Sequence, residues 1–323
     1  MITPMRRLGS IVTLAWVLSG VLPAFADERS WGYLIDKLVA DGVPRERVEE
    51  VFRDPRVAPF TGLEFSPSTP RESRSMYRRF LRPATLAAAH RCRVRYADAF
   101  EAAERTHGVS ADVVAAIIFI ESGCGYNTGS KVVLYRLARL AMANAPENLQ
   151  SNLERYTDSE GRIDPDTAAR LRTRAYYLEN TFYPEVRALF TVADRMGVDP
   201  LDIRGSGSGA FGYPQFLPTS YLQYGVDANG DGLVSLYDTD DAAASCARYF
   251  AGHGWRPGLS TKERRAAVWQ YNHSEAYVDT VLALAARINS APVTHTKQVA
   301  KRKRPKGHPQ KRRVATTQQE TRG

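Results

Sequence analysis

Apolar side chains recur at intervals of three and four residues along most of this chain, which is the spacing of one face of an α-helix. The first such stretch, residues 30–53, carries five of them: Trp31, Leu34, Ile35, Leu38 and Val39. The same pattern predicts helices over residues 88–106, 165–195, 240–251 and 262–288. Residues 55–70 are rich in proline, serine and threonine, which predicts a loop. The fold class is therefore predicted to be mainly α (α+β), with a small strand-containing segment around residues 204–238.

The N-terminus has the three parts of a secretory signal peptide. Arg6 and Arg7 precede a mostly apolar stretch over residues 11–22, and Ala24-Phe25-Ala26 fits a small-x-small cleavage site. The apolar stretch is too short to span a bilayer comfortably. No cysteine sits at the cleavage site to carry a lipid anchor. We therefore expect a signal peptide over 1–26 and a periplasmic protein that begins at Asp27.

The net charge of +9 belongs to the C-terminal tail alone. Residues 297–323 hold ten lysines and arginines against one acid, whereas residues 27–296 hold 32 bases and 34 acids. The helical pattern also stops near residue 291, so 291–323 is predicted to be a disordered basic tail. We expect first a solvated tail without a specific partner. Among partners, anionic envelope polymers fit an exported protein better than nucleic acid does.

Three cysteines, Cys92, Cys124 and Cys246, would enter an oxidising compartment. One disulfide and one free thiol is one outcome, without a choice of the pair, and three small buried thiols is the other. Their spacing fits no zinc site.

One predicted helix carries a glutamate near its end. Ser110 is a residue type that caps helix N-termini, and residues 111–120, most of them apolar, run directly into Glu121. The helical period places residues 114, 117, 118 and 121 on one face, so Glu121 continues an apolar face. A carboxyl held against apolar side chains loses hydration, which raises its pKa toward the range of a general acid near neutral pH. The plain alternative is a glutamate bonded to a local turn.

Three motifs resemble those of one enzyme family. Glu121-Ser122-Gly123-Cys124-Gly125 resembles the Glu-Ser-x-x-Gly signature of lysozyme-like lytic transglycosylases. Residues 209–221 look like the second motif, a Gly-Ala-x-Gly followed by Gln-Phe-x-Pro-Ser, and residues 271–277 resemble the third, a Tyr-Asn motif ending in tyrosine. In order and spacing the chain is similar to the lytic transglycosylase B family over roughly residues 30–288. The resemblance implies a lysozyme-like transglycosylase domain over 27–290.

The resemblance also implies a mechanism with a single catalytic glutamate and no cofactor. Glu121 would protonate the oxygen that links N-acetylmuramic acid to N-acetylglucosamine in peptidoglycan glycan strands. It would then remove the proton of the C6 hydroxyl, which gives 1,6-anhydromuramic acid without consuming water. Ordinary glycosidases need two carboxyls. No second acid occupies a recognisable motif near Glu121, and Glu147, Glu160 and Asp164 are candidates without a pattern.

The family motifs assign the residues that would hold the sugar. Ser206, Gln215, Tyr271 and Asn272 are expected to position the muramic acid residue, and Tyr277 to orient Glu121. Their hydroxyl and amide groups can bind sugar substituents or be satisfied within the protein.

The chain departs from the family at a few positions. Ser208 stands where alanine is usual and Pro214 where glycine is common. After Pro146, where relatives carry arginines, this chain has Glu147-Asn148, which puts recognition of the acidic stem peptide in question.

A twelve-residue segment fits the spacing of an EF-hand calcium loop. Oxygen donors fall at positions 1, 3, 5, 7, 9 and 12, with Gly232 at position 6: Asp227, Asn229, Asp231, the Leu233 carbonyl, Ser235 and Asp238. Hard cations need several oxygens on a tight turn, so a structural Ca²⁺ (or Na⁺) is expected, as the family resemblance also implies. An ion-free turn rich in aspartate, asparagine and glycine is the alternative.

Two rival functions remain at this point. A goose-type hydrolytic lysozyme on the same scaffold would differ only in its product. A non-catalytic peptidoglycan-binding scaffold would keep Glu121 as a vestige. In each case the protein is expected to act as a monomer.

Overall fold

The computed structural model describes residues 31–68 and 72–289, and within them the chain forms thirteen α-helices, one 3-10 helix and one two-stranded sheet. The mainly α class is therefore confirmed. The predicted signal peptide (1–26) and basic tail (291–323) lie outside the described residues and stay predictions. Within the described part, no helix combines the length and the apolar character needed to cross a membrane.

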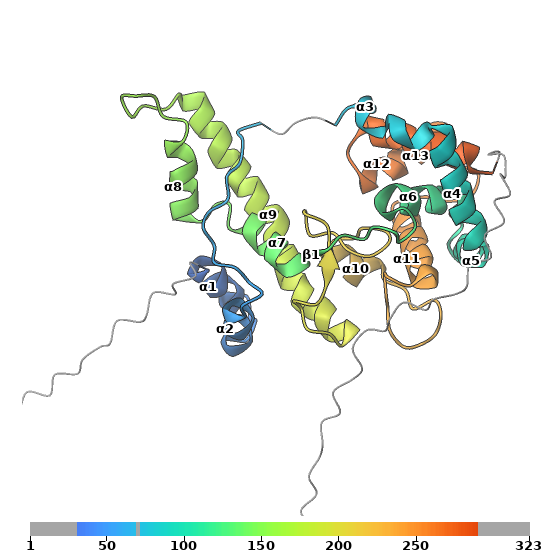
Figure 1. Ribbon diagram of the computed structural model, residues 1–323, viewed down its shortest axis with the longest axis horizontal. Helices are drawn as coiled ribbons and strands as arrows, with labels where there is room; N and C mark the ends of the chain where they lie inside the picture. Colours follow the sequence, from blue (N-terminus) through green and yellow to red (C-terminus); the bar gives the residue numbers. More distant parts are fainter. Residues whose placement is uncertain (1–30, 69–71, 290–323) are drawn as a thin grey trace, which may run out of the picture.

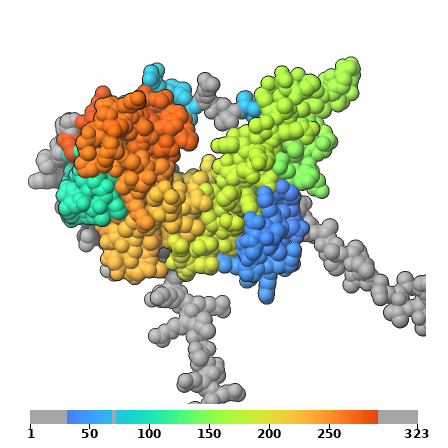
Figure 2. Space-filling view, turned by 180° about the vertical axis from the view of Figure 1, so that it is seen from behind, coloured from blue at the N-terminus to red at the C-terminus, as the bar shows by residue number. Residues whose placement is uncertain are grey.

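One lobe is built around the longest helix and lies on the left of Figure 1. Its helices are α1 (Gly32–Ala40), α2 (Arg45–Arg53), α7 (Val133–Ala141), α8 (Pro146–Glu154) and α9 (Pro165–Met196). Trp31 lies in its core, with its ring 5.2 Å from those of both Phe52 and Phe60. Viewed from behind, the outer ends of α8 and α9 project from the body as an arm (Figure 2).

The second lobe surrounds α6 (Ala111–Ser122), the helix predicted to carry the glutamate. The other members are α3 (Arg74–Tyr77), η1 (Arg78–Leu81), α4 (Pro83–Arg95), α5 (Ala97–His107), α11 (Thr239–Gly252), α12 (Thr261–Tyr271) and α13 (Glu275–Ile288). α6 packs against α4, α5, α11 and α13. Its residues from Val113 to Ile118 are all buried, so the helix is enclosed on every side and not only along one face.

The two lobes meet at a small sheet and a short helix. β1 (Lys131–Val132) pairs antiparallel with β2 (Arg204–Gly205), and single bridges join Gly205 to Phe211 and Phe211 to Phe216. α10 (Pro218–Tyr224) follows. The predicted strand-containing segment, 204–238, holds β2, but β1 lies outside it. A two-residue strand is too short to show an alternating pattern, so its position could not be predicted.

Turns divide three of the predicted helices. The stretch 30–53 breaks between α1 and α2, where Pro44 disfavours a helical conformation for the residue before it. The stretch 88–106 breaks at Tyr96, and 262–288 breaks at residues 272–274. The periodicity continues across each break because both helices of a pair face a shared core. By contrast, α9 and α11 run unbroken over the predicted ranges 165–195 and 240–251.

The start of α6 differs from the expectation in one detail. Ser110 occupies the N-cap position, but its side chain makes no capping hydrogen bond. The carboxylate of Glu104, on the preceding helix α5, accepts from the Ala111 amide instead, at 3.0 Å. A cap supplied by another helix is a tertiary contact, which residue type alone does not predict.

Candidate active site

Glu121 lies in the last turn of α6 and is partly buried. The Tyr277 hydroxyl, from α13, donates a hydrogen bond of 2.6 Å to its Oε1. Burial raises the pKa of Glu121 from 4.5 to about 7; the Tyr277 hydrogen bond acts in the opposite direction, and the charge of Glu72 adds to the rise. The carboxyl is thus poised between its protonated and ionised forms near neutral pH.

Two stacked tyrosines support this carboxyl. The rings of Tyr271 and Tyr277 are nearly parallel, with centroids 6.4 Å apart and planes 6° apart. The Tyr271 hydroxyl donates to the carbonyl of Pro214 in the second motif. Burial raises the pKa of both phenols well above 10, so both stay neutral and can donate hydrogen bonds. Tyr277 therefore contacts Glu121 as predicted, and Tyr271 joins the third motif to the second.

A second carboxylate lies near Glu121, and sequence patterns did not reveal it. Glu72 accepts a hydrogen bond of 2.6 Å from the Tyr77 hydroxyl, which the Asn272 side chain also contacts. The Tyr77 ring stands edge-on to that of Tyr277 at 5.9 Å. Glu72 and Tyr77 precede Glu121 by more than 40 residues and belong to no motif, so only the packing of α3 against α13 brings them here.

The acids considered as a second carboxyl from the sequence lie elsewhere. Glu147 is in the first turn of α8, Glu160 pairs with Arg162, and Asp164 caps α9 by accepting from the Thr167 amide at 2.8 Å. All three belong to α8, to the start of α9 or to the loop between them, on the opposite side of the molecule from α6 (Figure 1). They are therefore excluded as partners of Glu121.

The second motif forms a loop against the turn that follows α6. Gln215 donates through Nε2 to the carbonyls of Thr128 (3.1 Å) and Gly212 (2.8 Å), and it holds a left-handed backbone with φ of 53°. The Ser206 hydroxyl accepts from the Ala210 amide at 3.1 Å. Ser206 and Gln215, two of the four predicted sugar-binding residues, thus have a structural role in shaping the loop.

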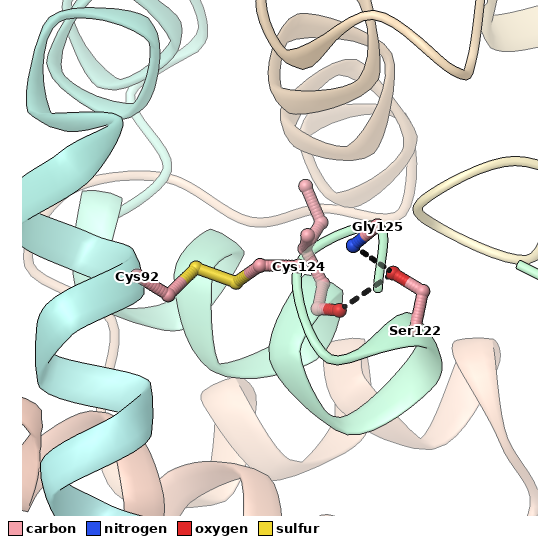
Figure 3. The surroundings of a disulfide bond; sticks show 5 residues. Cys92, Ser122, Cys124 and Gly125 are labelled. Atoms are coloured by element: carbon pink, nitrogen blue, oxygen red, sulfur yellow. Dashed lines mark hydrogen bonds between the residues drawn. A yellow bond between two sulfur atoms is a disulfide. The ribbon is translucent and has the colours of Figure 1, made fainter. Parts of the chain in front are cut away.

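The cysteines take the first of the two outcomes left open. Cys92 and Cys124 form a disulfide that joins α4 to the turn after α6 (Figure 3). Cys246 is a buried free thiol. Burial, with a contribution from Glu121, raises the pKa of the Cys246 thiol well above its usual value. Cys246 therefore stays protonated beneath the site.

The predicted calcium loop is a compact turn held by its own side chains. Asp227 accepts from the amides of Gly230 and Gly232 at 2.8 and 2.9 Å, and Asp231 accepts from Leu233 at 2.9 Å. Asn229 accepts from the Asp231 amide at 3.0 Å.

The acid at position 12 of this loop does not close it. Asp238 caps α11 instead, accepting from the Asp240 amide at 2.9 Å. The buried Asp241 reaches back instead, accepting from the amides of Ala228 and Ser235 at 2.8 and 2.7 Å. The EF-hand spacing did not indicate Asp241, because this acid lies three residues, or about one helical turn, after position 12.

The donor chemistry of this turn fits a hard cation. Asp227, Asn229 and Asp231 provide carboxylate and amide oxygens within five residues. Within residues 31–68 and 72–289, however, no three His, Cys, Asp or Glu side chains are grouped closely enough to hold a metal. Cation binding at this turn stays a prediction.

The chain is similar in sequence to one family of known proteins. Residues 27–266 match the family model described as a transglycosylase SLT domain. The chain is 30% identical over 247 residues to membrane-bound lytic murein transglycosylase B of Escherichia coli (strain K12), which covers 72% of this chain and 60% of that protein. The chain thus spans less than two thirds of that relative's length.

Solved structures share the fold at low sequence identity. The soluble lytic transglycosylase SltB1 from Pseudomonas aeruginosa superposes with a TM-score of 0.61 at 22% identity, covering 81% of this chain and 98% of that one. The Escherichia coli lytic transglycosylase Slt35 in complex with calcium gives 0.60 at 23%, covering 83% and 95%. SltB3 from Pseudomonas aeruginosa in complex with NAG-anhNAM-pentapeptide gives 0.58 at 20%, covering 81% and 79%.

Proposed function

The chain belongs to the transglycosylase SLT domain family, and from that premise we propose that it is a peptidoglycan lytic transglycosylase. It cleaves the β-1,4 bond between N-acetylmuramic acid and N-acetylglucosamine and forms 1,6-anhydromuramic acid, with Glu121 as both acid and base. The observation that carries the proposal is the state of Glu121. A carboxyl with a pKa of about 7, oriented by a 2.6 Å hydrogen bond from a neutral tyrosine, can give up a proton and take one back at the same pH.

The two proton transfers place different demands on the site. Protonated Glu121 first gives its proton to the glycosidic oxygen as the bond to the leaving N-acetylglucosamine breaks. The carboxylate that remains then removes the proton of the muramic acid C6 hydroxyl as its oxygen bonds to C1. Tyr277 donates to Oε1 and steadies the ionised form between the two steps. Oε2 is left to exchange protons with the substrate.

The remaining site residues are proposed to hold the sugar. Ser206, Gln215, Tyr271 and Asn272 carry hydroxyl and amide groups on the loop and helix ends near Glu121. SltB3, which shares the fold, has been solved with NAG-NAM-pentapeptide and with NAG-anhNAM-pentapeptide. Those ligands have the chemistry of the substrate and product that we propose.

The function is tested by the products formed from purified sacculi. Mass spectrometry of the digest is expected to show muropeptides lighter than the hydrolysis products by one water. Reducing-end sugars would instead indicate a hydrolytic lysozyme, and Glu72 would then be the first candidate for its second carboxyl. Binding to sacculi without any released product would support the non-catalytic scaffold.

The effect of the Glu72 charge on Glu121 should be measurable in the pH dependence of kcat/KM. Glu72 raises the pKa of Glu121, so Glu72→Gln should lower it. Because Glu121 must be protonated to begin the reaction, the alkaline limb of kcat/KM should then move to lower pH. Glu50→Gln on α2 removes the same charge far from α6 and should leave that limb in place, since distant exposed charges are screened. An unmoved or raised limb in Glu72→Gln would show that Glu72 does not act on Glu121.

We also propose that the turn over residues 227–231 binds Ca²⁺. Slt35, which shares the fold, has been solved in complex with calcium. Asp227, Asn229 and Asp231 would hold the ion, which would stiffen the turn before α11 and take no part in the chemistry. Calcium at 100 times its dissociation constant should raise Tm by roughly 5–10 °C, and EDTA should reverse the rise.

A matched pair of variants tests the location of the ion. Asp227→Ala should abolish the calcium-dependent rise in Tm. Asp158→Ala removes an aspartate that likewise accepts from turn amides, at Glu160 and Arg162, and should keep the rise. The same rise in both variants would place the ion elsewhere.

The cellular location follows from the same proposal. Residues 1–26 are proposed to direct export to the periplasm, where peptidoglycan lies. Appearance of the protein in the periplasmic fraction, beginning at Asp27, is the expected result.

A further inference from the structure

The disulfide is attached to the motif that carries Glu121. Cys124 is the third residue after Glu121, and its partner Cys92 lies on α4, with 6.3 Å between the two Cα atoms. Figure 3 shows the bond reaching from α4 to the turn that closes α6. Cys92 is buried and Cys124 partly exposed, so the link runs from the core to the edge of the site.

The linked turn has a conformation that a free chain rarely adopts. Gly123, Cys124 and Gly125 all have left-handed backbones, with φ of 60°, 60° and 81°. Glycine tolerates this conformation, but in a cysteine it is sterically unfavourable. Local hydrogen bonds also support the turn: the Gly125 amide donates to the Ser122 hydroxyl at 3.0 Å, and that hydroxyl donates to the Ile118 carbonyl at 3.1 Å (Figure 3).

Residues 125–129 meet the second motif at two points and the strand β2 before it at a third. The Tyr213 ring lies against Gly125 so closely that a β-carbon there would stand 2.1 Å from it. Gln215 donates to the Thr128 carbonyl at 3.1 Å, and Gly129 packs on the backbone of Gly205. A shift of this segment would therefore move Gln215 and the loop that we propose holds the sugar.

We infer that the Cys92–Cys124 disulfide is a positioning device for catalysis, which holds the turn after Glu121 in the one conformation that keeps the acid and the sugar-binding loop in register. The inference rests on the proposed function. The disulfide touches neither substrate nor reacting atoms, and it acts through residues 122–129. The core of the second lobe is formed by apolar side chains from six helices, so we expect the lobe to keep its fold without the bond.

The first test compares kinetics with and without the bond. In Cys92→Ala/Cys124→Ala, kcat on sacculi should fall roughly 10- to 100-fold, as expected when a reacting group is displaced by about 1 Å. KM should rise as well, because the sugar-binding loop moves with the turn. Each single variant should lose as much as the double, since either substitution removes the same bond. Dithiothreitol, which reduces the disulfide to two thiols and is itself oxidised to a cyclic disulfide, should slow the wild type and not affect the double variant.

A control separates positioning from general stability. Ala89→Gly loosens the same buried face of α4 but leaves the disulfide intact. It should lower Tm while kcat, measured well below Tm, is kept. If the double variant instead behaves like Ala89→Gly, with a lower Tm and an unchanged kcat, the bond is only structural and the inference is wrong.

A second readout does not depend on turnover. Hydrogen–deuterium exchange over residues 122–129 should be faster in the double variant than in the wild type, with exchange in α9 unchanged. If the wild type is inactive but exchange over residues 122–129 is still faster in the double variant, the proposed function is wrong and the bond still orders the turn. Equal exchange in both proteins would reject the positioning inference, whatever the activity.

Discussion

Replacing Glu121 with glutamine is expected to reduce the release of muropeptides from sacculi by roughly three to four orders of magnitude. General acid or base catalysis by a single side chain contributes about 10²- to 10⁴-fold, and here one carboxyl performs both transfers. Glutamine keeps the size of the side chain and can still accept the hydrogen bond that Tyr277 donates to Glu121, so the fold and the site should persist. The loss should fall on kcat, with binding of sacculi retained.

Glu121→Gln is also expected to increase the free energy of unfolding at high pH. The pKa of Glu121 is about 7 in the folded protein and close to 4.5 in the unfolded chain. Between these values the folded state binds more protons, so wild-type stability falls as the pH rises through this window and then levels off. Glu121→Gln has no carboxyl at this position, so its stability does not fall in this pH window. It should match the wild type at about pH 4 and exceed it by on the order of 2 kcal/mol above pH 8.

Denaturant unfolding of both proteins at the two pH values measures the difference. A variant that is less stable than the wild type at high pH would show that Glu121 is not desolvated. Residual activity near the wild-type level would show that another residue is the acid.

Tyr277→Phe is expected to lower kcat roughly 10- to 100-fold while leaving KM within about twofold. The substitution removes only the hydroxyl that orients Glu121, and phenylalanine keeps the ring stacked on Tyr271. Because this hydrogen bond lowers the pKa of Glu121, its loss should raise that pKa. The alkaline limb of kcat/KM should therefore move to higher pH, opposite to the effect of Glu72→Gln.

Tyr183→Phe provides the matched control. Tyr183 is also a buried tyrosine, and its hydroxyl hydrogen-bonds Lys37 and Asp41 in the other lobe. That variant should lose some stability but keep kcat and the pH profile. A Tyr277→Phe enzyme with an unmoved limb, or one moved to lower pH, would contradict the orienting role of Tyr277.

Contact between Glu121 and Tyr277 followed from the motifs, whereas their surroundings did not. Each of these residues lies in a motif of consecutive residues, and such a motif can be recognised in the sequence. Glu72 and Tyr77 lie in a segment without a motif, and the Cys92–Cys124 pair was one of several arithmetic choices. The calcium-type loop shows the same limit, because the buried acid that closes it is Asp241 and not the Asp238 that the spacing indicated.

The sequence by itself determined the mainly helical class, the helix that carries Glu121 near its end, and the order of the three motifs. These features depend on side chains within a few turns of one another, so their spacing along the chain records them. The tertiary structure alone decided which cysteines pair, which second carboxylate approaches the site, and how far the pKa of Glu121 rises, to about 7. Each of these depends on how α3, α4, α6 and α13 pack together. Desolvation and Coulomb interactions act through distances in space, and the distance between two residues along the chain does not fix them.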